Sequence, residues 1–123
     1  CSSEVEAISK FYKSAKVACH TRYEYPLDAI QNAFPREDVL IEFFERLFSY
    51  GSYNRIQSFL GISLPIPCFF ERVNATFKAE FISTSLKSRV AYEYAQTYSI
   101  VHKNFGENIF ELWPNANLVR PFI

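Results

Sequence analysis

The sequence predicts an α+β domain in which a helical N-terminal half packs on a small, mixed or antiparallel, β-rich C-terminal half. Three observations predict this class. Apolar residues recur at three- and four-residue steps as far as Gly61, and Pro65 and Pro67 then interrupt that period. The segments beyond them are rich in aromatic and β-branched residues, which favour strands. Helices that are segregated along the chain from strands are typical of α+β proteins and not of doubly wound ones.

Four segments of the N-terminal half, residues 1–61, have the helical period. The first is expected near 4–18, and the second ends before Pro35, which cannot continue a helix interior. The third begins at Pro35, has the widest apolar face and stops at Gly51, and the fourth ends at Gly61. The apolar positions of these segments are, in chain order, Val5, Ile8, Tyr12 and Ala15, then Leu27, Ile30 and Phe34, then Leu40, Phe43, Phe44, Leu47 and Phe48, then Tyr53, Ile56, Phe59 and Leu60.

The C-terminal half, residues 62–123, is expected to hold the strands. The composition predicts strands at 68–73, 79–82 and 108–112, and residues 118–123 could pair back on them after a turn. One helix is expected directly after the second strand. The apolar stripe of this helix consists of Leu86, Val90, Tyr94 and Tyr98.

Length and composition predict a single domain spanning residues 1–123 and limit its partners. The 13 basic and 13 acidic residues cancel, which removes the electrostatic case for a nucleic-acid partner. No apolar run approaches the ~18 residues that a membrane-spanning helix needs. His20 and His102 have no carboxylate or thiolate at ligand spacing, so no metal site is predicted.

The cysteines leave the redox state open. Cys1, Cys19 and Cys68 cannot all pair within one chain. A Cys19–Cys68 disulfide is an option if the protein is secreted, and two buried thiols are the alternative. The sequon Asn74-Ala75-Thr76 slightly favours a secreted or extracellular location. Methionine is absent even at position 1, which predicts a processed or incomplete chain.

One region carries a family resemblance. Arg72 lies on the first predicted strand, and Phe81-Ile82-Ser83-Thr84-Ser85-Leu86 closes the second strand, with Val90-Ala91 on the helix behind it. An Arg-bearing strand, a Ser-Thr-Ser triplet and a following helix in this order resemble the arginine-specific mono-ADP-ribosyltransferases, in both their toxin-like and vertebrate ectoenzyme branches. The resemblance extends from Pro67 to the neighbourhood of Glu111.

The resemblance implies an NAD-dependent transferase with a partial ADP-ribosyltransferase fold and its NAD site in 62–123. In that family an Arg contacts the NAD phosphates and the Ser-x-Ser triplet shapes the nicotinamide site. Arg72, Thr84 and Ser85 are therefore expected to bind NAD, and Ser83 is expected to act in catalysis. A guanidinium suits bidentate phosphate contact, and a hydroxyl can orient a ribose. NAD is the implied substrate, and a protein side chain, arginine above all, is the implied acceptor.

The Glu-x-Glu motif that completes catalysis in that family has no counterpart here. It should follow a strand beyond 108–112, and no such motif occurs between Leu112 and Ile123. Glu107 and Glu111 are separated by three residues and not by one. We therefore expect this chain to be inactive by itself.

Two other functions stay open. The apolar helix faces at 39–48 and 53–60 could form the groove of a non-enzymatic helical protein-interaction module, with the Ser83 to Ser85 triplet merely capping a helix. An NAD glycohydrolase would use the same site as the transferase and would pass ADP-ribose to water.

Overall fold

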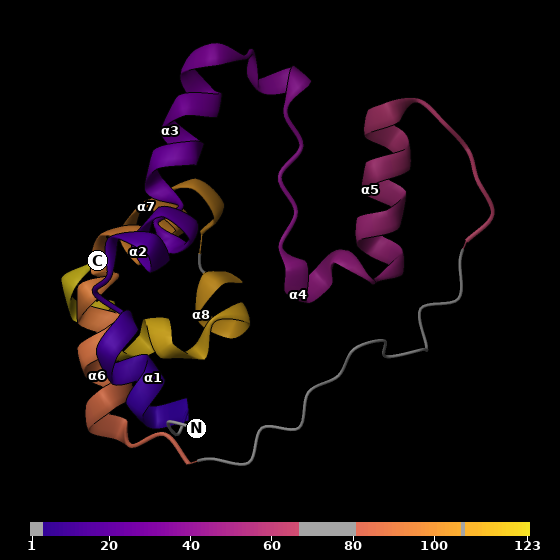
Figure 1. Cartoon of the computed structure of the whole chain (residues 1–123). Coiled ribbons are helices and arrows are strands. Elements are labelled where there is room, and N and C mark those ends of the chain that lie inside the picture. The colour runs from indigo at the N-terminus through magenta and orange to yellow at the C-terminus, as the bar shows by residue number, and fades with distance from the viewer. Residues whose placement is uncertain (1–3, 67–80, 107) are drawn as a thin grey trace. The chain divides into compact units, whose positions relative to one another are not determined.

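The computed structural model describes residues 4–66, 81–106 and 108–123, and 73% of these residues are helical (Figure 1). The described part contains no strand, so the predicted β-rich C-terminal half is wrong and the fold is all-α. The chain divides into two compact units. Unit 1 consists of residues 1–30 with 78–123, and unit 2 consists of residues 31–77.

Unit 1 begins with α1 (Glu4–Phe11) and α2 (Ala15–Thr21), followed by α3 (Glu24–Ala33). The boundary with unit 2, after Ile30, falls inside α3. The single helix expected near 4–18 is two helices, because Ser14 starts a new one. Its backbone is extended (φ −69°, ψ 143°), and its Oγ accepts a hydrogen bond from the Val17 N–H at 3.3 Å. A serine in this position satisfies one of the amides that a helix start leaves without an intrahelical partner.

The C-terminal part of unit 1 holds α6 (Thr84–Glu93), α7 (Ala95–Phe105), α8 (Asn108–Leu112) and the 3₁₀ turns η2 (Pro114–Leu118) and η3 (Arg120–Phe122). The helix expected over the Leu86 to Tyr98 stripe is therefore interrupted at Tyr94. The Tyr94 hydroxyl donates to the Tyr12 carbonyl at 2.6 Å, which joins this interruption to the end of α1.

The strands predicted at 108–112 and 118–123 are wrong. Gly106 ends α7 with φ 75°, and the chain then makes one more helical turn that places Ile109 in the core at 0% exposure. Pro114 and Pro121 each lie in the first turn of a 3₁₀ segment, where the amide that proline lacks has no intrahelical acceptor. The predicted strand at 68–73 lies outside the described residues. Of the one at 79–82, Phe81 and Ile82 are described and belong to no regular element.

The core of unit 1 is built where α6 meets η2 and where α7 meets α8. Ala91 and Ala116, at 1% and 0% exposure, are small enough to let α6 and η2 approach closely. The larger apolar side chains buried around them are Leu27, Leu86, Tyr94, Val101, Ile109 and Val119.

Unit 2 consists of η1 (Arg36–Asp38), α4 (Phe44–Leu47) and α5 (Tyr50–Leu60). The long helix predicted from Pro35 to a stop at Gly51 is wrong, and Gly51 lies inside α5. Residues 39–43 form no regular element, and the backbone is extended at Val39 (φ −124°, ψ 118°) and at Phe43 (φ −77°, ψ 133°). The apolar positions of this segment have a helical period, but the side chain of Glu42 within it is held by Ser52 and Arg55 of α5.

The predicted end of the fourth segment at Gly61 is confirmed by α5. Ser49 caps the start of this helix by accepting from the Ser52 N–H at 3.2 Å. Gly61 is left-handed (φ 65°), and the Ile62 and Gly61 amides donate back to the Gln57 and Ser58 carbonyls at 3.1 and 3.3 Å. This pair of bonds is the Schellman motif, and glycine adopts its left-handed conformation without steric cost.

Candidate functional site

The Ser83 to Ser85 triplet lies at the start of α6. Ser83 is the N-cap, with φ −61° and ψ 147°, and its Oγ accepts a hydrogen bond from the Leu86 N–H at 3.3 Å. Leu86 is 2% exposed and anchors this end of the helix in the core, whereas all three hydroxyl residues are exposed. The capping interpretation of the triplet therefore has direct geometric support.

The triplet keeps hydrogen-bonding groups that the helix cap does not use. A serine hydroxyl has one donor and two acceptor lone pairs, and the cap uses a single lone pair of Ser83. The Thr84 and Ser85 hydroxyls make no hydrogen bond within the described part of the chain. The first amides of a helix also point outward and favour an anion. The start of α6 thus presents exposed donors in a setting that suits a phosphate group.

The other residues of the predicted NAD site are not assembled with the triplet by the described structure. Arg72 and the neighbouring Phe69 and Phe70 lie outside the described residues. Phe81 is 84% exposed directly ahead of the triplet. Tyr94, on the following helix, is buried, and its hydroxyl donates to the Tyr12 carbonyl.

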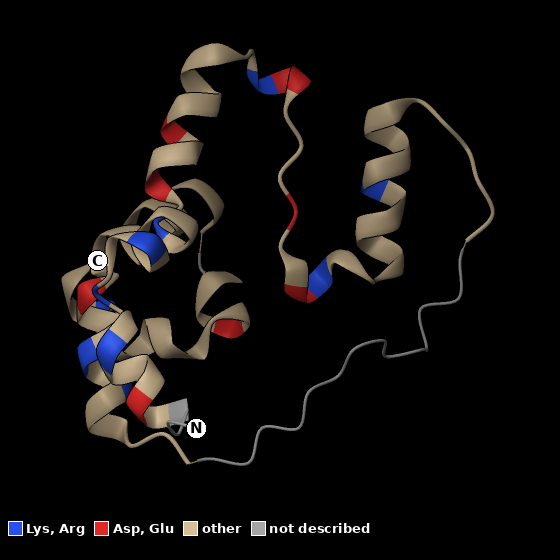
Figure 2. Cartoon of the chain, viewed as in Figure 1, with Lys and Arg blue, Asp and Glu red and all other residues tan. Residues whose placement is uncertain are grey.

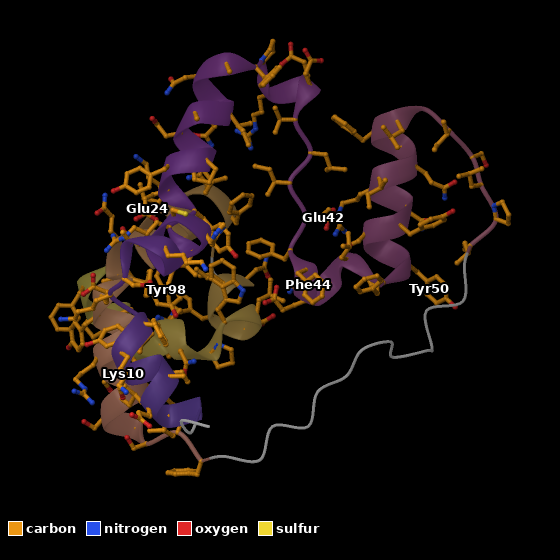
Figure 3. The ribbon with its side chains drawn as sticks, in the orientation of Figure 1. Lys10, Glu24, Glu42, Phe44, Tyr50 and Tyr98 are labelled. Carbon is orange, nitrogen blue, oxygen red and sulfur yellow. The ribbon has the colours of Figure 1, made fainter. Side chains whose placement is uncertain are left out.

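A second polar cluster lies in unit 2 and is named here the Glu42 clasp, which consists of Glu42, Ser52 and Arg55. Arg55 donates from Nε to Glu42 Oε1 at 2.6 Å and from Nη2 to Glu42 Oε2 at 2.8 Å. Ser52, which is fully buried, donates its hydroxyl to the same Oε2 at 2.8 Å. Figure 3 shows the Glu42 side chain between the extended trace and α5. The clasp therefore fastens residues 39–43 to α5.

The clasp sets the protonation of its carboxylate. The hydrogen bonds from Arg55 lower the pKa of Glu42, the Ser52 hydroxyl adds to this, and desolvation opposes it. The same contact raises the pKa of the Arg55 guanidinium. Both shifts favour the ionised pair, so the geometry supports a charged structural contact. General acid chemistry would instead need a carboxyl group with a raised pKa.

A third polar cluster links the two sequence-distant parts of unit 1. Arg22 reaches Glu93 at 3.0 Å and Glu24 at 3.4 Å. Glu24, at 4% exposure, also accepts a hydrogen bond from the buried Thr97 hydroxyl. A buried carboxylate needs such partners, because burial of an unpaired charge costs several kcal/mol. This cluster explains why a glutamate can face the core at the start of α3.

Unit 2 also exposes many apolar side chains. Figure 2 shows one basic position on α5 and an uncharged chain from there to Ile66. These side chains are named the unit 2 apolar surface, and their exposed fractions lie between 42% and 73%. Its members are Phe44, Phe48, Tyr50, Phe59, Leu60, Ile62, Leu64 and Ile66.

Within residues 4–66, 81–106 and 108–123, no group of His, Cys, Asp and Glu could hold a metal ion. No helix of that part is long and apolar enough to cross a bilayer. Cys19 is an exposed free thiol, and Cys68 lies outside the described residues. His102 packs against Phe110 with ring centroids 5.1 Å apart.

Together these features define, in its described part, an all-α chain with a hydroxyl triplet at one helix start and two carboxylate clusters. No family model, no curated protein and no solved structure matches the chain.

Sequence reasoning missed Glu24 and Glu42. A charged residue inside an apolar run is expected to pair with an opposite charge, and this pattern could have identified Glu42. Glu42 is the single charged residue of the run Val39-Leu40-Ile41-Glu42-Phe43-Phe44. The partner could not be named, since Arg46 and Arg55 follow at plausible distances and only the path of the chain selects Arg55.

Proposed function

We propose that the start of α6 binds NAD and that the chain is an ADP-ribosyltransferase-like domain, inactive by itself. The observation that carries the proposal is the exposed Ser83-Thr84-Ser85 triplet, in which the cap leaves the Ser83 O–H available as a donor. The resemblance of this triplet and of Arg72 to the arginine-specific transferases supplies the ligand. The proposal makes no use of a β-rich half, since the described part of the chain is all-α.

Each residue has a distinct role in this proposal. Arg72 supplies a guanidinium for the NAD phosphates, and Thr84 and Ser85 supply hydroxyls beside them. Ser83 donates to the ribose next to nicotinamide and orients it. When nicotinamide leaves, positive charge develops on that ribose, and a carboxylate is needed to stabilise it. That group is expected to be the missing Glu-x-Glu, so ligand binding and not turnover is the property to measure.

Calorimetric titration of NAD into the full chain tests this function. Ser83→Gly is the informative variant, because glycine at an N-cap costs only about a few tenths of a kcal/mol but carries no side-chain donor. We expect about tenfold weaker binding for Ser83→Gly and for Arg72→Ala, the loss that one hydrogen bond to a charged or polar ligand group produces. Ser58→Ala, which changes an exposed serine of α5, is the matched control. A folded wild-type chain that does not bind NAD, or binding that all variants retain, contradicts the proposal.

The choice between transferase and glycohydrolase depends on the acceptor. If nicotinamide is released without any guanidine acceptor, the activity is that of a glycohydrolase. If the release rate rises when an arginine analogue is added, the activity is that of a transferase. We expect neither rate to exceed that of the Ser83→Ala control in this chain.

The unit 2 apolar surface favours a second candidate, a helical protein-interaction module. Exposed apolar side chains on a folded unit mark contact sites when they gather on a few neighbouring elements. A photo-crosslinking amino acid at Leu60 is expected to give an adduct with another protein, and one at the exposed Asp28 of α3 is the control. Equal labelling from both positions would remove this candidate.

A further inference from the structure

The end of α5 and the residues directly after it expose a run of apolar side chains. No charged residue occurs in the sequence between Arg55 and Glu71. In the described part of this stretch, five large apolar side chains have exposed fractions between 42% and 57%. They are part of the unit 2 apolar surface and are named here the apolar tip, which consists of Phe59, Leu60, Ile62, Leu64 and Ile66. Exposed apolar side chains that follow one another so closely mark a site of contact.

Two hydrogen bonds hold the chain after Gly61 to the helix before it. The Leu64 amide donates to Gln57 Oε1, and the Tyr53 hydroxyl donates to the Pro65 carbonyl at 3.0 Å. Because Tyr53 and Gln57 lie four residues apart on one helix, they are neighbours on its surface. Figure 1 shows the chain leaving the end of α5 and turning back in the direction of the helix start. The apolar tip is therefore a loop of fixed path on unit 2.

The same contacts satisfy backbone groups that an apolar environment would penalise. The left-handed Gly61 and the residue after it donate to the last-turn carbonyls of α5. The Leu64 amide has Gln57 as its acceptor. Pro65 has no amide hydrogen, and its carbonyl accepts from Tyr53. A backbone group without a partner is costly in hydrocarbon, where no water can bond it, so these bonds prepare the loop for contact with lipid.

These features favour a lipid surface over a protein as the partner of the apolar tip. An interface between proteins typically has about one hydrogen bond per 100–200 Å² and a polar rim. The backbone donors described above are already used within unit 2, and the side chains of the tip are hydrocarbon throughout. A lipid surface requires no hydrogen bonds from the protein. It requires apolar side chains without a charge among them.

We propose that the apolar tip inserts into the interfacial layer of a lipid bilayer and holds unit 2 at a membrane surface. The insertion is shallow, about 5–10 Å into the boundary between headgroups and acyl chains, because the described part of the chain has no helix able to cross a bilayer. Neutral and anionic lipid should bind equally well, since the stretch carries no charge. The inference is independent of NAD binding, and a protein on the same surface is the competing outcome.

Flotation of the full chain with phosphatidylcholine vesicles tests the insertion. We expect the wild type to float with the vesicles and Leu64→Asp to partition about tenfold more weakly or worse, because a carboxylate replaces a buried isobutyl group. Leu64→Met stays apolar and should partition as the wild type does. Phe11→Asp on α1 is the matched control, since Phe11 is 56% exposed and Leu64 is 55% exposed. Helical circular dichroism verifies that each variant is folded.

The site of insertion is tested separately in a chain whose three cysteines are replaced by serine. An environment-sensitive nitrobenzoxadiazole label on Leu60→Cys should brighten and shift to the blue when phosphatidylcholine vesicles are added. The same label on Asp28→Cys of α3 should not change.

Four results would each overturn the proposal. The first is a folded wild-type chain that does not bind vesicles, and the second is equal partitioning of Leu64→Asp and the wild type. The third is binding that needs phosphatidylserine and disappears in salt, which would assign it to electrostatic attraction. The fourth is a protein adduct from Leu60 that Leu64→Asp abolishes while no vesicle binding occurs, which would assign the surface to a protein partner.

Discussion

Arg55 on α5 holds Glu42 from the preceding extended segment by two parallel hydrogen bonds, Nε to Oε1 at 2.6 Å and Nη2 to Oε2 at 2.8 Å. Fork-to-fork contacts of this kind fix direction as well as position. The Glu42 side chain is 11% exposed, whereas that of Arg55 is 54% exposed. Water therefore cannot replace the hydrogen bonds that Arg55 makes to the Glu42 carboxylate.

Removing the charge of Glu42 should loosen unit 2. Glu42→Gln keeps the shape and loses both charge-assisted bonds, which we expect to lower the free energy of opening of α5 by about 1–2 kcal/mol after allowance for the exposure of Arg55. Hydrogen exchange at the Ser52 and Tyr53 amides measures this. Glu37→Gln, an exposed change on η1, should leave those exchange rates unaltered, and an equal effect of the two variants would contradict the account.

The clasp also predicts a pH dependence. The pKa of Glu42 is lower in the folded chain than its ordinary value of 4.5, chiefly because of Arg55. The unfolded chain therefore takes up the proton first. The stabilisation is fully present above the ordinary value and is lost as the pH falls from there through the lowered pKa. The protection factor of the Ser52 amide, which removes the pH dependence of intrinsic exchange, should fall in this acid range in the wild type, and the difference in protection between wild type and Glu42→Gln should shrink in parallel.

The cap at Ser83 should contribute to stability whether or not NAD binds. Ser83→Ala leaves the Leu86 amide without its acceptor and should destabilise unit 1 by about 1 kcal/mol, whereas Ser83→Asn should stay within a few tenths. Urea unfolding followed by the fluorescence of Trp113, the single tryptophan, reports on this unit. An alanine variant as stable as the wild type would mean that the cap is not formed in solution.

The buried pair of Glu24 and Thr97 should be sensitive to loss of one hydroxyl. Thr97→Val preserves the shape but removes a hydrogen bond from a carboxylate that is 4% exposed, so we expect a loss of about 1–3 kcal/mol. Thr97→Ser retains the hydroxyl and should recover most of that stability. Urea unfolding followed by Trp113 fluorescence measures both variants. If Thr97→Val and Thr97→Ser lose similar amounts of unfolding free energy, packing and not the hydrogen bond accounts for the loss.

Local sequence signals were reliable where neighbouring residues alone decide the structure. The end of α3 before Pro35, the end of α5 at Gly61 and the cap interpretation of Ser83 follow from bonds that close within a few residues. Proline lacks the amide, glycine tolerates a positive φ, and a serine hydroxyl reaches the third amide after it. These features do not depend on what else the chain contacts.

The predictions of secondary structure were wrong in segments whose composition is compatible with both a helix and an extended strand. Residues 108–112 have strand-like composition, yet they form a helical turn because Gly106 turns the chain and Ile109 is then buried in the core of unit 1. Residues 39–48 have a helical period, yet the first five are extended because Glu42 is held by Arg55 on α5. In both cases a distant or buried contact overrode local preference.

The sequence by itself determined the helical character of the first half, the helix ends at Pro35 and Gly61, and the hydroxyl triplet at 83–85, since each rests on contacts within one turn of chain. The tertiary structure decided that the C-terminal part of unit 1 is helical and that residues 39–43 form no helix. It also decided which carboxylates are buried. The physical reason is that a buried carboxylate must meet a donor, and only the folded path of the chain brings Arg55 to Glu42 and Thr97 to Glu24.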